Sequence, residues 1–137
     1  MPARSSRSST PIGTASGSAT ISSDAIDRCF AELRSRRRKA LVVYLTAGHP
    51  DVEQSLALLR GVTDAGADVV EIGVPFSDPM ADGPVIQASS QRALENGMTF
   101  DRSLELIQRA AVPTPIVLFS YLNPLLAAGP DALVRAS

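Results

Sequence analysis

The chain contains a single cysteine and no apolar run long enough to cross a membrane. One thiol, Cys29, cannot form an internal disulfide, which favours a reducing compartment such as the cytosol. Spanning a bilayer takes about 20 consecutive apolar residues, and no segment approaches that length. A secretory signal is missing too, because no apolar core follows the charged amino terminus. The sequence therefore predicts a cytoplasmic protein that does not enter a membrane.

A basic face is also missing, although the amino-terminal end is basic. The net charge is +2 over residues 1–23, +3 over residues 24–39 and −6 from Ala40 onward. A nucleic-acid-binding protein carries its basic residues across one face of the fold, so binding to nucleic acid is not expected. The run R-S-R-R-R-K at residues 34–39 is interpreted as the solvated last turn of a helix, favoured by the helix dipole. The alternative is a nucleic-acid or targeting patch.

Residues 1–23 are rich in serine and threonine, with eight Ser and three Thr. Such a segment buries too little apolar surface to offset the entropy lost on ordering, so it is predicted to be a disordered tail. It also carries arginine and no acidic residue, which overlaps with the composition of organelle transit peptides. Organelle targeting is therefore the alternative to a cytoplasmic location.

From Asp24 onward, helical and strand patterns alternate. Asp24 is a plausible N-cap, Asp51 and Gln54 are spaced like a capping box, and Gly66 and Gly97 are typical helix stops. The predicted strands are Ala40–Gly48, Val69–Val74 and Pro115–Tyr121. The predicted helices begin at Asp24, after Asp51, at Pro84, at Thr99 or Phe100, and at Pro130-Asp131, while Asn123-Pro124 ends the third strand. The alternation predicts an α/β fold with parallel strands, and three strands suggest the front part of a larger domain.

Two carboxylates stand out around the second predicted strand, in E-I-G-V-P-F-S-D-P-M-A-D-G-P. Glu71 interrupts an apolar strand, and Asp82 lies on the loop before the next helix. Functional groups of parallel α/β folds gather at the carboxyl ends of strands and on the loops that follow, so the pair suits acid–base chemistry. The alternatives are that Asp78 and Asp82 cap a helix, and that Glu71 pairs with an arginine from a neighbouring strand.

The segment EIGVPFSDPMADGPVIQ closely resembles the signature of the tryptophan synthase alpha chain family. YLTAGHPD and SYLNPLLAAG resemble the turns that follow the first and third strands of that family, and the likeness extends from Asp24 to the end of the chain. The resemblance implies a (β/α)₈ TIM barrel, of which residues 24–137 would be the N-terminal part with about three strands. It also implies a lyase that cleaves indole-3-glycerol phosphate to indole and glyceraldehyde 3-phosphate by a retro-aldol step.

The resemblance also implies roles for individual residues. Glu71 would be the acid–base group that protonates the indole ring at C3, and Asp82 would hold the indole N–H and stabilise the cation that develops on the ring. The apolar walls around the indole would be Tyr44, Ile86, Phe119 and Tyr121. Tyr44 stands where many members carry phenylalanine.

The family further implies a partner. Its members dock on a beta chain that consumes indole with pyridoxal phosphate, in an α₂β₂ heterotetramer, and the alpha chain itself needs no metal and no organic cofactor. The loop Pro75–Pro84, with Pro75 and Asp78, would belong to the surface that communicates with the beta chain. The phosphate-binding loops of such barrels follow strands seven and eight, which are not in this sequence, so this chain alone is expected to be inactive. The alternative is a non-catalytic half-barrel that binds a partner such as the beta chain.

Overall fold

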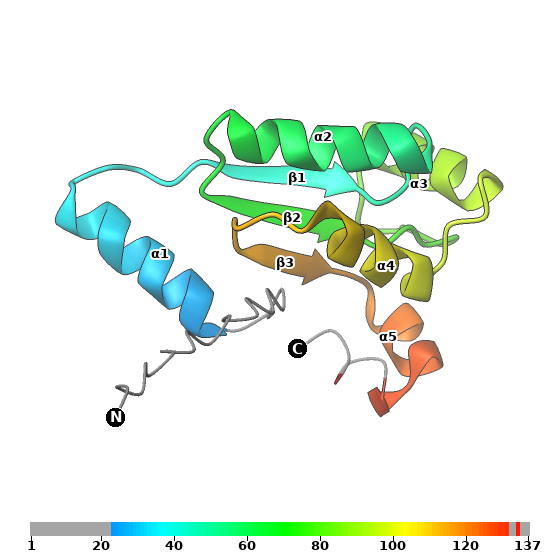
Figure 1. Ribbon diagram of the computed structural model, residues 1–137. Helices are drawn as coiled ribbons and strands as arrows, with labels where there is room; N and C mark the ends of the chain where they lie inside the picture. The colour runs from blue at the N-terminus through cyan, green and yellow to red at the C-terminus, as the bar shows by residue number, and fades with distance from the viewer. Residues whose placement is uncertain (1–22, 132–133, 135–137) are drawn as a thin grey trace, which may run out of the picture.

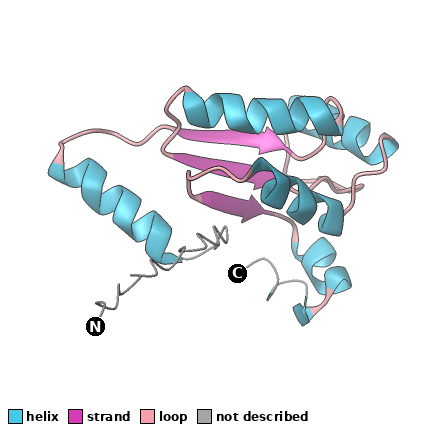
Figure 2. Ribbon diagram, in the orientation of Figure 1, coloured by secondary structure: helices cyan, strands magenta, loops and turns pink. Residues whose placement is uncertain are grey.

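Three parallel strands lie side by side in the computed structural model, which describes residues 23–131 and 134. They are β1 (Val42–Thr46), β2 (Val69–Gly73) and β3 (Ile116–Phe119), with β2 in the centre (Figure 1). The helices are α1 (Ser23–Ser35), α2 (Val52–Asp64), α3 (Pro84–Glu95), α4 (Phe100–Ala110) and α5 (Leu122–Ala128). All three strands point the same way, and helices connect them (Figure 2). The predicted α/β alternation is therefore confirmed, while the tail predicted at residues 1–23 lies outside the described residues except for Ser23.

Local capping sets several helix ends as predicted. Asp51 is the N-cap of α2, and its carboxylate accepts a hydrogen bond of 2.9 Å from the backbone N–H of Gln54. The hydrogen bonds from Gln54 lower the pKa of the Asp51 carboxyl. Thr99 caps α4 in the same way, accepting from the N–H of Arg102. Gly97 follows α3 with a φ of +76°, a conformation that glycine adopts without strain.

Other boundaries differ from the prediction. Helix α1 begins at Ser23, so Asp24 lies in its first turn and is not the N-cap. Each strand is shorter than predicted at one or both ends, because ladder pairing stops where the neighbouring strand ends. Helix α5 was not predicted, since Pro124 was expected only to break the chain. Proline is tolerated in the first turn of a helix, where its missing N–H has no partner to lose.

One face of the sheet is covered by α2 and α4. Val70 and Ile72 of β2 pack with Leu59 of α2 and Leu106 of α4 in one cluster, and each of these four side chains is 0–1% exposed. Alternate residues of β1 and β3 add to the same cluster from either side of β2. Because successive strand residues point to opposite faces, the second face of the sheet carries a different set of side chains.

The basic run at residues 34–39 begins in the last turn of α1, as predicted for Arg34, and continues beyond the helix as a turn. Helix α1 ends at Ser35, and the following residues lie outside it. Just beyond the helix, Arg36 pairs with Glu32 of α1 at 2.5 Å, and Arg38 pairs with Asp68 just before β2. Asp68 also accepts a hydrogen bond of 2.8 Å from the N–H of Leu41, so its carboxylate ties the end of the α1–β1 connection to the start of β2.

Two adjacent leucines of α2 provide a test of the core. Leu59 is fully buried, whereas Leu58 is 46% exposed. Leu59→Ala should lower the free energy of unfolding by about 2–5 kcal/mol, because it leaves a cavity in the packed cluster. Leu58→Ala, the matched control, should change it by about 0.5 kcal/mol or less. Urea titration followed by circular dichroism measures both, and equal effects would contradict the described core.

Candidate functional site

The alternation of β2 places Glu71 on the face away from α2 and α4. Its neighbours Val70 and Ile72 are both in the apolar cluster, so Glu71, between them, points to the opposite side. Glu71 is the middle residue of β2, and it lies in register with Tyr44 of β1 and Val117 of β3. Its side chain is half-buried, and it joins no ion pair within the described part of the chain. Pairing with an arginine of a neighbouring strand is therefore wrong as an explanation of Glu71.

Two aromatic rings predicted to form the pocket wall meet on this same face. The ring of Tyr44 packs edge-on against Phe119 of β3, with a centroid distance of 6.1 Å and an interplanar angle of 89°. The phenol lies over Gly73, where an added Cβ would come within 2.0 Å of the Tyr44 oxygen. Gly73 thus leaves room for the tyrosine, which explains a glycine inside a buried strand.

Asp82 lies on the loop between β2 and α3, and Tyr121 binds its carboxylate. The Tyr121 hydroxyl donates to Oδ2 of Asp82 at 3.1 Å. The N-cap of α3 is Gly83, which makes no side-chain capping bond. Neither Asp78 nor Asp82 therefore caps this helix, and the capping alternative is wrong for both residues.

Burial and neighbouring charges both shift the pKa of the Tyr44 phenol. Burial raises the pKa of the Tyr44 phenol, a hydrogen bond with Thr46 opposes this, and the negative charges of Asp82 and Glu71 raise it further. The strand register sets Glu71 beside Tyr44 on one side of the sheet, and the hydrogen bond from Tyr121 holds Asp82 against the chain just after β3.

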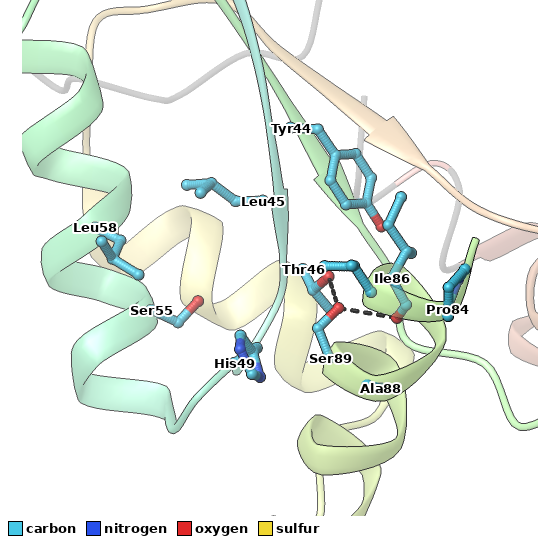
Figure 3. A pocket seen from close by; sticks show the side chains of 11 residues that line it. Tyr44, Leu45, Thr46, His49, Ser55, Leu58, Pro84, Ile86, Ala88 and Ser89 are labelled. Carbon is cyan, nitrogen blue, oxygen red and sulfur yellow. Dashed lines mark hydrogen bonds between the residues drawn. The ribbon is translucent and has the colours of Figure 1, made fainter. Parts of the chain in front are cut away.

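A cavity of about 630 Å³ opens beside these residues, between α2, β1 and α3 (Figure 3). Tyr44 and Ile86 both line it, so the cavity joins two of the four predicted wall residues. Inside it, the hydroxyls of Thr46 and Ser89 lie 2.7 Å apart, and Ser89 donates to the carbonyl of Ile86. Glu71 and Asp82 are not among its lining residues, so the cavity reaches Tyr44 and Ile86 and does not contain the carboxylates.

The two loop residues assigned to partner contact lie apart from this cavity. Pro75 is buried and lines a second groove of about 470 Å³ together with Phe76, Asn123 and residues from the start of α4. Asp78 is exposed on the loop. The loop therefore has an inner side against β3 and α5, and an outer side open to solvent.

Sequence reasoning missed the residue that holds this loop from α3. The Gln87 side-chain amide donates to the carbonyl of Asp82 at 2.9 Å and to that of Pro79 at 3.3 Å. The only sequence signal was its place at the end of the quoted motif.

The described residues contain no group of acidic, histidine or cysteine side chains that could hold a metal ion. Within the same part of the chain, every helix is too short or too polar to cross a membrane.

Comparison with known proteins identifies the family to which the chain is similar. A family profile described as "Tryptophan synthase alpha chain" matches residues 30–137. The chain is 56% identical over 108 residues to the tryptophan synthase alpha chain of Gluconacetobacter diazotrophicus, covering 77% of this chain and 39% of that protein. It is 52% identical over 103 residues to the tryptophan synthase alpha chain of Xanthomonas axonopodis pv. citri, covering 73% of this chain and 38% of that protein.

Solved structures give the same result. The tryptophan synthase subunit alpha of Legionella pneumophila superposes with a TM-score of 0.77 and 38% identity, covering 82% of this chain and 46% of that one. A chain of the aminoacrylate-bound tryptophan synthase of M. tuberculosis superposes with a TM-score of 0.73 and 36% identity, with the same coverage. The chain spans less than half the length of these relatives, and its three-stranded sheet corresponds to the N-terminal part of their (β/α)₈ barrel.

The raised pKa of Tyr44 predicts a loss of stability in alkali. A phenol whose pKa is higher in the folded state stabilises the fold below the unfolded value of about 10. That stability is lost as the pH rises through the folded pKa, because the buried phenol then ionises. In a Tyr121→Phe background, the absorbance of Tyr44 at 295 nm should therefore rise at a higher pH than that of an ordinary tyrosine. Adding urea should return the midpoint of this rise to the pH of an ordinary tyrosine.

The matched comparison is Tyr44→Phe, which removes the ionising group and keeps the ring. Its free energy of unfolding should fall less than that of the parent chain above about pH 10. An ordinary titration of Tyr44 in the folded chain, or the same alkaline loss in both proteins, would contradict the burial of this phenol.

Proposed function

Because the chain belongs to the tryptophan synthase alpha chain family, we propose that it supplies the acid–base site of an enzyme that cleaves indole-3-glycerol phosphate. The products are indole and glyceraldehyde 3-phosphate, and the reaction class is a carbon–carbon lyase. The observations that support the proposal are the register that sets Glu71 beside Tyr44 across the sheet and the hydrogen bond by which Tyr121 holds Asp82 on the following loop. In this proposal, residues 24–137 form the N-terminal portion of the barrel domain.

The two carboxylates have different tasks in this reaction. Glu71 gives a proton to C3 of the indole ring, which becomes tetrahedral, and takes the proton from the glycerol hydroxyl next to the breaking bond. Positive charge develops on the ring nitrogen as C3 is protonated, and the Asp82 carboxylate accepts a hydrogen bond from the ring N–H. A fixed carboxylate at that point stabilises the transition state more than the ground state. Cleavage of the carbon–carbon bond returns the electron pair to the ring and releases indole.

Apolar side chains complete the proposed site. Tyr44, Ile86, Phe119 and Tyr121 enclose the indole ring, and the edge-to-face contact of Tyr44 with Phe119 supports a preformed aromatic wall. In barrels of this type, the phosphate is held by loops after strands seven and eight. Strand β2 provides Glu71 and the loop that follows it provides Asp82, while the phosphate would bind in that later part of the barrel.

We propose the beta chain as the protein partner, in an α₂β₂ heterotetramer. The loop Pro75–Pro84 would face it, with Pro75 and Asp78 in or near the contact. The alpha-chain reaction uses no metal and no organic cofactor, and pyridoxal phosphate belongs to the beta chain. Tryptophan biosynthesis of this kind places the protein in the cytoplasm.

A chimera tests the proposed chemistry. Residues 24–137 would replace the matching part of the Gluconacetobacter diazotrophicus alpha chain, so that the rest of the barrel comes from that relative. Glu71→Gln keeps the shape and hydrogen-bonding capacity of the side chain but removes the proton, so kcat should fall by at least about 10²–10⁴-fold. Asp82→Asn should also lower kcat, because the amide no longer balances the ring cation. Release of indole measures turnover.

The matched control is Glu105→Gln, which makes the same chemical change on an exposed position of α4. It should leave turnover within about twofold of the parent chimera. Near-normal turnover of the Glu71→Gln chimera would refute the acid–base role. An inactive parent chimera that still binds the beta chain would favour the non-catalytic half-barrel instead.

A further inference from the structure

The Tyr121 hydroxyl makes two hydrogen bonds to the loop between β2 and α3. It accepts one of 2.9 Å from the backbone N–H of Ala81, and it donates one of 3.1 Å to Oδ2 of Asp82. Tyr121 lies directly before α5, so these bonds connect the end of the third βα unit to the loop of the second. A backbone N–H can only donate and a carboxylate can only accept, so the phenol oxygen accepts from Ala81 and the phenol proton goes to Asp82.

The ring of Tyr121 is also held. It packs on Phe76 near the start of the same loop, with a centroid distance of 5.2 Å and an interplanar angle of 37°. The backbone nearby is paired as well, because the N–H of Val74 donates to the carbonyl of Phe119 at 2.8 Å. The packing of the Tyr121 ring on Phe76 and the pairing of the backbone before Tyr121 therefore hold the phenol oxygen in place.

The backbone and the side chain of Asp82 are held from opposite sides. Gln87 of α3 donates to its backbone carbonyl, whereas Tyr121 donates to its carboxylate. No hydrogen bond to Oδ1 of Asp82 is formed within the described residues, and a carboxylate has about four lone-pair sites to offer. One oxygen is thus oriented by the protein, and the other is left for a ligand.

The geometry points to Tyr121 as a positioning residue that acts through Asp82. Its hydroxyl orients the carboxylate so that Oδ1 can accept the N–H of the indole ring, which gives the residue a task beyond forming an apolar wall. A carboxylate oriented in advance does not have to reorganise when charge develops on the ring. This inference rests on the proposed function for its consequence in turnover, while the contact itself can be tested without any reaction.

The contact can be tested by tyrosine emission from the 137-residue chain, which has no tryptophan and only two tyrosines. Tyr44→Phe leaves Tyr121 as the only emitting phenol. A carboxylate that accepts a phenol proton quenches tyrosine emission, so adding Asp82→Asn should raise the emission. Asp78→Asn changes the charge of the same loop equally at an exposed position, and it should leave the emission unchanged. Circular dichroism checks that all three proteins share one fold.

The role in turnover can be tested in the chimera with Tyr121→Phe. The ring stays and the hydroxyl is lost, so a side chain that only formed a wall would leave kcat unchanged. Loss of a hydrogen bond to a charged group predicts a fall in kcat of about 10- to 100-fold, with KM little affected. Because Tyr121 is inferred to act through Asp82, Tyr121→Phe combined with Asp82→Asn should be no slower than Asp82→Asn alone.

Any one of three results would overturn the inference. The first is equal emission from the Asp82→Asn and Asp78→Asn chains, and the second is a normal kcat in Tyr121→Phe. The third is a pair of losses in kcat that multiply in the double variant, which would contradict action through Asp82. Failure of the parent chimera to turn over would instead refute the proposed function, and the emission experiment would still decide the contact.

Discussion

The pairing of β2 with a parallel strand on each side is the constraint on which the rest of the structure depends. Its register sets Tyr44, Glu71 and Val117 in one row across the sheet. A slip of one residue would turn Glu71 into the cluster formed with α2 and α4, and it would turn Ile72 outward. Placing an unpaired carboxylate in that cluster would cost several kcal/mol. The apolar core therefore fixes the face on which Glu71 stands.

The same constraint explains the side chains around Glu71. Tyr44 is the next residue in the row, and its ring lies along the face toward Gly73 because that position has no side chain. Phe119 pairs with Gly73 on the other side of β2, which brings its ring to the edge of Tyr44. The absence of a side chain at Gly73 thus allows the rings of Tyr44 and Phe119 to meet on this face. Any larger residue there would displace the phenol.

Sequence reasoning succeeded where the determinants are local. The bond between Asp51 and Gln54 spans three residues, and the apolar run around Glu71 indicates a buried strand without any knowledge of the fold. It did not reach the bond between Tyr121 and Asp82, which lie 39 positions apart. Their contact depends on how the second and third βα units pack, and no periodicity carries that information. The cavity between α2 and α3 was missed for the same reason.

The two carboxylates differ in how firmly the fold holds them, and this difference has a functional meaning. Glu71 belongs to a strand paired on both sides, so moving its backbone would break the sheet. Asp82 sits on a loop held by side-chain hydrogen bonds from Gln87 and Tyr121. Such bonds contribute about 0.5–3 kcal/mol each, so they hold the loop less firmly than ladder pairing on both sides holds β2. The separation of the two carboxylates therefore depends on the side-chain hydrogen bonds of the loop, whereas the position of Glu71 depends on the pairing of the strands.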